Sequence, residues 1–381
     1  MAGSIRKRNG SWEVRINLGR DPLTGVRRQR SETVRGNKRD AECAMVRLLR
    51  ERDTGIDIEP GRLTVAQFLE RWLRDYGAPN TRPKTYRRYA ELLRLHVIPL
   101  IGSIPLNKLR PLHVQRVYAR MIEQDLSART ALHCHRVLKG ALVHAVRGQL
   151  LARNPADGVD PPKPDRHEIN PPVPDAVLRI MDAAEQTSIG ALVHTAVMTG
   201  LRQAELLGLR WQDLDLDTGL LRVKQTAQWL PGKGFLFVPP KTPKSRRTVD
   251  LSPRTTARLR QQRQHQLEER LLVGPVYQDR DLVFATPVGG AIDPSNLRRS
   301  WNRVLARAGV GHVRFHDLRH AHATLLLQQG AHVKVISERL GHAGIGITMD
   351  TYGHLLPGIQ AQAAARLDTL FDPPARALGE Q

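Results

Sequence analysis

Seven prolines lie between residues 154 and 175, in the stretch NPADGVDPPKPDRHEINPPVPD. Proline locks its own φ angle and lacks the backbone N–H that helix interiors and central strands need. We therefore expect neither a helix nor a central strand here, but an extended, semi-rigid connector between separately folded parts of the chain. A second joint is predicted at 54–62, where TGIDIEPGR combines two glycines with a proline.

The two joints predict three domains, over residues 1–55, 62–155 and 170–381. The chain has 381 residues, of which 40% are hydrophobic and 25% charged, a globular composition that suits two or three domains. No run of about eighteen apolar residues and no apolar segment after the basic start is present, so neither a membrane span nor a secretory signal is expected. Two cysteines are too few for a disulfide framework, which favours the reducing cytoplasm.

The charge of the chain predicts a polyanionic partner. There are 59 lysines and arginines against 37 aspartates and glutamates, a formal net charge of +22. The excess is concentrated in residues 62–155, which hold 17 basic and 5 acidic residues. Such a concentration suits a surface that follows a phosphate backbone, because each contact releases condensed counterions. Nucleic acid is the expected partner, and a basic face that only keeps the protein soluble is the alternative.

Residues 1–55 are predicted to form a small α+β domain, a three-stranded sheet backed by one helix. SWEVRINLG alternates apolar and polar residues, DPLTG has turn residues, RRQRSETV resumes an extended pattern, and KRDAECAMVRLLRER has helical spacing. The exposed strand face is a candidate for reading a DNA groove, the alternative being a solvated accessory domain. Its candidate DNA-binding residues are Arg15, Arg27, Arg28 and Arg30.

Residues 62–155 are predicted to be an all-α bundle of about four helices with one strongly basic side. Thr64 and Gln67 have the spacing of a capping box, and Ser127 is a suitable N-cap for the last helix. Helical spacing places Tyr76 and Leu100 on the apolar faces of the first two helices. The candidates for phosphate contact are Arg87, Arg88, Arg94 and Lys139.

Residues 170–381 are predicted to be mainly helical with a few strands, a mixed α+β domain. One apolar helix is expected to end at Gly200 and another at Gly341. FLFVPP and RRTVDL flank the turn KTPKS and are expected to pair as a hairpin. Five short polar motifs occur here: TGLRQAELLGLRW, PPKTPKSRRTVDL, HDLRHAHATLLLQQG, ERLGH and DTYGHL. Taken singly, each has an ordinary explanation, such as a helical ion pair between Arg202 and Glu205.

A zinc site is the main alternative for the histidines of this domain. His316 and His320 are four residues apart, as in helical zinc motifs, but Asp317 follows the first histidine where zincins have glutamate. Arg319 lies inside the candidate site, and its guanidinium repels a dication and cannot deprotonate. We therefore expect no metal.

In this order and spacing, the Arg, Lys, His-x-x-Arg, His and Tyr of the five motifs resemble the tyrosine recombinases, the phage-integrase family of site-specific DNA strand-exchange enzymes. The resemblance covers residues 175–365. In architecture it extends to the SAM-like, core-binding helical domain and to the small arm-binding domain of many phage and transposon integrases. It implies that residues 1–55 bind arm-type DNA sites, that 62–155 bind the core site, and that 170–381 are catalytic.

The resemblance implies a site that makes a phosphodiester electrophilic. Arg202 and Arg319 match the two arginines that hold the non-bridging oxygens, and His342 takes the position that adds a hydrogen bond to them. These donors would stabilise the negative charge of the pentavalent transition state. No cofactor is implied.

The resemblance also implies a covalent intermediate. Tyr352 matches the nucleophile, and because the ordinary pKa of tyrosine is about 10, its hydroxyl must be activated. His316 is placed to accept the phenol proton. Lys241, with Lys244 as a less favoured substitute, matches the acid that protonates the departing 5′ oxygen. The product would be a 3′-phosphotyrosyl linkage, which the reverse attack reseals without ATP or metal.

The family acts as a homotetramer on double-stranded DNA attachment sites, so the same assembly is implied here. An excisionase and a DNA-bending host factor are possible further partners, and the expected location is the cytoplasm, in association with the nucleoid. Apolar residues between 355 and 367 are expected to dock on a neighbouring protomer.

Three alternatives stay open. An Xer-type recombinase would resolve chromosome or plasmid dimers, but enzymes of that type lack an arm-binding domain, so residues 1–55 favour the integrase of a mobile element. A type IB topoisomerase would relax DNA without sequence choice. The third alternative is a sequence-specific DNA-binding protein without catalysis, against which the complete catalytic set argues.

Overall fold

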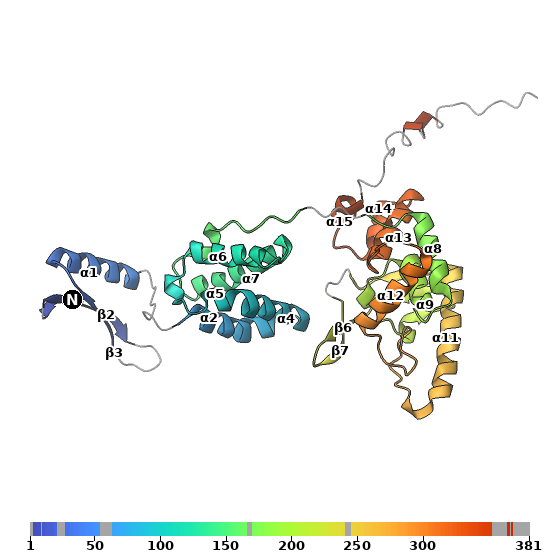
Figure 1. Cartoon of the computed structure of the whole chain (residues 1–381), viewed down its shortest axis with the longest axis horizontal. Coiled ribbons are helices and arrows are strands. Elements are labelled where there is room, and N and C mark those ends of the chain that lie inside the picture. Colours follow the sequence, from blue (N-terminus) through green and yellow to red (C-terminus); the bar gives the residue numbers. More distant parts are fainter. Residues whose placement is uncertain are drawn as a thin grey trace, which may run out of the picture. The chain divides into compact units, whose positions relative to one another are not determined.

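The computed structural model describes residues 3–8, 10–20, 27–53, 63–165, 170–240, 245–352, 364–365 and 367–368. The chain divides into two compact units, Met1–Arg166 and His167–Gln381, and each is described by itself with the element labels of Figure 1. The predicted joint at 54–62 lies outside the described residues, as does most of the tail expected to dock on a neighbouring protomer.

The first unit begins with the predicted three-stranded sheet and helix. The strands pair antiparallel in chain order and one helix follows them: β1 (Gly3–Arg8), β2 (Ser11–Arg20), β3 (Arg27–Val34) and α1 (Lys38–Asp53). Val14 and Ile16 point to one face of β2 and form a core with Leu48 of α1. Because side chains alternate along a strand, Arg15 points to the other face, where its side chain is half exposed.

The rest of the first unit is the predicted helical bundle. Its elements are α2 (Val65–Trp72), η1 (Leu73–Gly77), α3 (Ala78–Asn80), α4 (Pro83–Leu92), η2 (Leu93–Val97), α5 (Ile98–Ile101), η3 (Leu106–Lys108), α6 (Pro111–Glu123), α7 (Ala128–Arg147) and η4 (Pro155–Gly158). Thr64 caps α2: its hydroxyl accepts the Gln67 N–H at 3.3 Å, and the Gln67 side chain accepts the Thr64 N–H at 3.0 Å. Ser127 caps α7 by accepting the Thr130 N–H. The capping residues expected from the sequence are thus confirmed.

Two π-helical turns change which side chains this bundle buries. α2 continues into η1 and α4 into η2, and a π turn closes its hydrogen bond one residue later than an α turn does. The residues that follow are therefore rotated relative to the helix face predicted from regular α spacing. Tyr76 and Leu100, expected to be buried, are 37% and 41% exposed.

The proline-rich connector begins with a short 3₁₀ turn, which differs from the wholly extended segment predicted. Pro155 takes the first helical position of η4, where no backbone N–H is required. Ala156 and Val159 pack into the core of the helical bundle. The described residues that follow, as far as 173, form neither helix nor strand.

The second unit is mainly helical. Its helical elements are α8 (Pro174–Glu185), α9 (Gly190–Thr199), α10 (Gln203–Leu206), η5 (Trp211–Asp213), α11 (Pro253–Val273), η7 (Gly274–Val276), α12 (Pro294–Ala308), α13 (Asp317–Gln328), α14 (Val333–Leu340) and α15 (Ile345–Tyr352). α9 is apolar on all sides and nearly every residue in it is buried, as a central helix requires. α8, α11 and α13 pack against it (Figure 1).

The strands of the second unit pair differently from the prediction. Two antiparallel sheets form, one from β4 (Leu214–Asp215), β5 (Leu220–Arg222) and β8 (Thr248–Asp250), the other from β6 (Thr226–Leu230) and β7 (Gly234–Val238). FLFVPP therefore pairs with the preceding strand and not with RRTVDL. Gly232 and Gly234 have positive φ, and this left-handed backbone closes the tight β6–β7 turn. In the described part of the chain, no helix is long and apolar enough to cross a membrane.

We expect Thr64→Ala to lower the stability of the helical bundle by about 1 kcal/mol, because the α2 N-terminus loses a cap. Urea unfolding of the full chain, followed by hydrogen exchange of α2, measures the change. Gln67→Ala is the matched variant. If the two single variants and the double variant all lose the same free energy of unfolding, Thr64 and Gln67 act as one unit. If the loss in the double variant equals the sum of the two single losses, the capping box is not coupled.

Candidate active site

Two helix ends meet at the centre of the second unit. α9 ends at Gly200 and α14 at Gly341, with φ of +64° and +66°. A Cβ on Gly200 would lie 2.6 Å from His322 Cδ2, and one on Gly341 would lie 2.9 Å from Arg247 Nη1. The positive φ and the close approach both require glycine. Each helix ends in backbone carbonyls without partners inside the helix.

Arg319, on the first turn of α13, joins the two helix ends. Its Nη1 donates to the Gly200 carbonyl and its Nη2 to the Leu340 carbonyl, both at 2.7 Å, and the residue is 3% exposed. The negative ends of the α9 and α14 dipoles partly offset the buried charge. Burial, and next the charge of Arg202, lower the pKa of Arg319 to about 9. The guanidinium therefore carries its charge at neutral pH.

Arg202 is held in the same place by a buried carboxylate. Its Nη1 lies 2.8 Å from Glu205 Oε1, and its Nη2 donates to the Gly341 carbonyl at 3.2 Å. Arg247 contacts both oxygens of Glu205, with Nη2 at 2.9 Å from Oε2. Burial raises the pKa of Glu205, but the hydrogen bond and charge of Arg247 and the charge of Arg202 outweigh it, so the pKa is lowered.

The described side chains around Glu205 form a cluster with a net positive charge, which we call the cationic cluster. Arg202, Arg247 and Arg319 are set against a single carboxylate, that of Glu205. The side chain of Arg202 is 36% exposed, whereas those of Arg247 and Glu205 are 6% and 2% exposed. A fixed, cationic cluster that opens to solvent at Arg202 suits a phosphate oxyanion.

Tyr352, the last residue of α15, lies against α13. Its hydroxyl is 2.7 Å from Nδ1 of His320, one helical turn beyond His316, and the residue is 1% exposed. Burial raises the pKa of Tyr352 to about 12 against the lowering charges of Arg319 and Arg202. Burial, and then the neighbouring His316, lower the pKa of His320 to about 4. At neutral pH the phenol is protonated and the imidazole is neutral.

His342 holds α15 one turn earlier. Its Nδ1 lies 2.7 Å from the hydroxyl of Thr348, which precedes Tyr352 by four residues on the same helix. Burial, followed by the charge of Arg319, lowers the pKa of His342 to about 4. His316 lies at the N-cap of α13 with its residue exposed. Two successive turns of α15 are therefore fixed by histidines, and the ring of the exposed His316 lies edge-on to that of His320, with centroids 5.3 Å apart.

The structure thus brings together five of the six residues predicted to be catalytic. Lys241 and its possible substitute Lys244 lie outside the described residues. The sequence analysis missed Arg247 and gave His320 only a possible role in metal binding. Arg247, Val249 and Leu251 are alternate residues in and beside β8, so Arg247 is expected on the same inward face as the two apolar residues. His320 follows His316 by four residues, which places both on the same helical face.

The residues predicted to contact DNA form ion pairs in most cases. Among the described side chains, pairs join Arg15 to Glu13, Arg87 and Arg88 to Glu91, Arg94 to Glu70, and Lys139 to Asp157. Arg27 is exposed, Arg30 is half-buried, and the side chain of Arg28 lies outside the described residues. Exposed pairs contribute little to stability, so a phosphate can replace the carboxylate at low cost.

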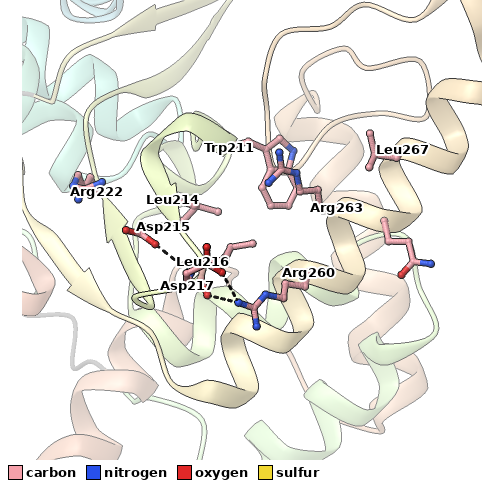
Figure 2. Close-up of a pocket in the computed structure, with 10 residues that line it drawn as sticks. Trp211, Leu214, Asp215, Leu216, Asp217, Arg222, Arg260, Arg263 and Leu267 are labelled. Atoms are coloured by element: carbon pink, nitrogen blue, oxygen red, sulfur yellow. Dashed lines mark hydrogen bonds and ion pairs between the residues drawn. The ribbon is translucent and has the colours of Figure 1, made fainter.

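A surface pocket of the second unit lies away from the cationic cluster. In the described ranges no group of three or more His, Cys, Asp or Glu is placed to hold a metal ion. A pocket of about 600 Å³ opens between α11 and the β4–β5 turn (Figure 2). There Arg260 donates to Asp217 and the Leu216 carbonyl, and Arg263 lies over the Trp211 ring. The residues that line it are not those of the cationic cluster.

A helical unit with clustered arginines, histidines and a buried tyrosine has the groups that attack on a phosphodiester by a tyrosine hydroxyl requires. Residues 173–358 match the phage integrase family, and residues 64–122 match the phage integrase N-terminal SAM-like domain. A protein of Caldanaerobacter subterraneus subsp. tengcongensis called tyrosine recombinase XerC-like is 31% identical, covering 94% of this chain and 96% of its own length. The chain belongs to the phage integrase family and is a tyrosine site-specific recombinase.

Another relative in sequence is also an integrase, and solved structures of integrases share the fold. The ICEBs1 integrase of Bacillus subtilis is 26% identical over 97% of this chain and 100% of its own length. The Tn1549 transposon integrase, solved in complex with a circular intermediate DNA, has a TM-score of 0.68 at 22% identity, covering 81% of this chain and 100% of that chain. A lambda integrase in a tetramer bound to a Holliday junction has a TM-score of 0.56 at 18% identity, covering 92% and 94%.

The second unit is expected to lose stability as the pH falls from 7 to 4.5. Burial, followed by the charge of Arg339, lowers the pKa of His322 from 6.5 to about 4. Over this range the unfolded chain binds the proton and the folded chain does not, so the free energy of unfolding falls by about 2 kcal/mol from this residue. Urea unfolding at both pH values tests this against His322→Gln. Equal pH dependence of the two proteins would contradict it.

Glu205→Gln is expected to destabilise the second unit by about 3 kcal/mol, because the guanidinium groups of Arg202 and Arg247 lose their shared buried carboxylate. Hydrogen exchange of α9 and α10 in urea measures the loss. The matched control is Glu268→Gln on an exposed position of α11, which should change stability by less than about 0.5 kcal/mol. A similar effect of both changes would show that Glu205 does not organise the cluster.

Proposed function

We propose that this chain is the integrase of a mobile element, which cleaves and rejoins DNA at attachment sites through a 3′-phosphotyrosyl intermediate. The observation that carries the proposal is that Arg202 and Arg319 bind the carbonyls at the ends of α9 and α14 and that the charges of both arginines act on the nearby Tyr352. A scissile phosphate bound by these two arginines would therefore be placed near Tyr352. The site is complementary to a phosphodiester under attack.

The charge of the site favours the transition state over the substrate. Three guanidinium groups and one carboxylate leave about two positive charges, and the transition state of phosphodiester attack carries one negative charge more than the substrate. Because Glu205 and the helix carbonyls already hold the arginines, little reorganisation is needed when that charge develops. The same donors stabilise the reverse reaction, which reseals the strand without ATP or metal.

Proton transfers complete the reaction. A histidine at the start of α13 accepts the phenol proton of Tyr352; the sequence predicts His316, whereas the ring nearest the hydroxyl is that of His320. Lys241 protonates the departing 5′ oxygen. His342 offers Nε2 to the phosphate, because its Nδ1 is engaged with Thr348.

The partners follow from the family and from the surface charge. Residues 1–55 bind arm-type sites through the β2–β3 face that carries Arg15, and residues 62–155 bind the core site through Arg87, Arg88, Arg94 and Lys139. The lambda integrase tetramer on a Holliday junction supports a homotetramer that exchanges strands between two attachment sites. An excisionase, a DNA-bending host factor and association with the nucleoid complete the proposal.

The Xer-type alternative stays compatible with the relatives. The match to the XerC-like protein covers 94% of this chain. Residues 56–381 make up a smaller share of the chain than this, so the match extends into residues 1–55 and that relative has a counterpart to part of the N-terminal domain. The separate sheet-and-helix domain and the integrase relatives favour a mobile element. Recombination between two copies of one site without any arm sequence would favour dimer resolution instead.

A nicked suicide substrate that carries the core site tests the chemistry. The wild-type chain should form a covalent protein–DNA complex in EDTA, visible on a denaturing gel, and Tyr352→Phe should form none because the nucleophilic oxygen is absent. Both proteins should bind the site equally. A covalent band with Tyr352→Phe, or no band with the wild type despite specific binding, would refute the proposed reaction.

A further inference from the structure

We propose that His320 is the catalytic residue that accepts the proton of Tyr352 during strand cleavage and returns it during resealing. The inference rests on the proposed function and assigns a residue to a proton transfer in that reaction. It stands on one contact: the Tyr352 hydroxyl lies 2.7 Å from Nδ1 of His320. That nitrogen touches the reacting oxygen.

Other contacts fix the positions of both His320 and Tyr352. His320 belongs to α13, whose first turn is fixed through Arg319 to the carbonyls of Gly200 and Leu340. Tyr352 belongs to α15, which Thr348 ties to His342 one turn earlier. Arg319 attaches α13 to the cationic cluster, and His342, which directly follows Gly341, holds α15. The imidazole and the phenol are therefore kept aligned beside that cluster.

The surroundings leave the imidazole ready to receive a proton. His316 lies across from it with ring centroids 5.3 Å apart, and Asp317, Arg319 and Arg314 are the charged groups near it on α13 and the preceding loop. Asp317 is paired with Arg314 at 2.8 Å, so its charge is largely balanced. Across from α13, His342 also faces the ring. Burial, and next His316, keep the ring neutral at pH 7, so the hydroxyl donates to Nδ1.

The step balances with no further reactant. As the Tyr352 oxygen bonds to phosphorus, its O–H bond breaks and the proton moves to Nδ1 of His320. The bond from phosphorus to the 5′ oxygen breaks at the same time, and that oxygen takes a proton from Lys241. The imidazolium then stands beside the negatively charged phosphate, which stabilises it. In resealing, the 5′ oxygen bonds to phosphorus and its proton returns to Lys241, while the bond from phosphorus to the Tyr352 oxygen breaks and His320 returns its proton to the leaving phenolate.

His320→Asn separates proton transfer from positioning. The asparagine side-chain oxygen takes the place of Nδ1 and keeps a hydrogen-bond acceptor, but it is not a base. Covalent complex formation by the full chain is measured on nicked core-site DNA with either an ordinary 5′ oxygen or a 5′ bridging sulfur at the scissile bond. The sulfur leaves without protonation, so it rescues the loss of a general acid but not of a base.

We expect His320→Asn to slow cleavage of both substrates by at least about 100-fold, the usual contribution of a general base. Lys241→Ala should be slow on the oxygen substrate and restored on the sulfur substrate. His312→Asn, at an exposed histidine outside the site, should cleave as the wild type does. If His320→Asn melts below the assay temperature, His320→Gln serves the same comparison.

A rate for His320→Asn within about threefold of the wild type would overturn the inference, because a hydrogen-bond acceptor would then suffice. Rescue of His320→Asn by the sulfur substrate would also overturn it, by placing His320 at the leaving group. These outcomes differ from failure of the proposed function, in which the wild type itself forms no covalent complex. Loss on both substrates with unchanged DNA binding supports the inference.

Discussion

The buried guanidinium of Arg319 is the interaction on which the active site depends. It is bound by carbonyls at the ends of α9 and α14, so it fixes the relative position of two helices that are far apart in sequence. A charge with 3% exposure is tolerated because helix dipoles and hydrogen bonds replace its hydration. The left-handed glycines at both helix ends allow the carbonyls to approach it closely.

The remaining active-site groups are arranged around that contact. Glu205 neutralises one of three guanidinium groups and holds two of them, Arg202 and Arg247, in place. The Glu205 carboxylate therefore has two roles. It positions the guanidinium groups of Arg202 and Arg247, and because it carries only one negative charge, the cluster stays cationic. Burial keeps Tyr352 protonated, while the charges of Arg319 and Arg202 favour its ionisation. Tyr352 and the cationic cluster are thus held in place by different contacts.

The histidines show how one helix serves several tasks. His316 lies at the N-cap of α13 and His320 and His322 lie within the helix, where these two contact different neighbours. His322 accepts from Arg339 and contacts the Val197 carbonyl, which ties α13 to α9 and α14. His320 faces Tyr352, and His316 is exposed. A histidine pattern that the spacing alone presents as a metal site is divided by packing into a structural group, a group at the nucleophile and an exposed group.

The sequence by itself determined the fold class of each part, the capping of α2 and α7, the helix ends at Gly200 and Gly341, and the family motifs, because these depend on local chemistry that the order of residues contains. It did not predict the exposure of Tyr76 and Leu100, since π turns arise from packing and have no spacing signal. It misassigned the partner of β7, because the tight turn that Gly232 and Gly234 allow pairs this strand with β6. Only the tertiary structure decided that Arg247 joins Glu205 and that His320 contacts Tyr352, since these pairs are 42 and 32 residues apart in the chain and meet only when different elements pack together.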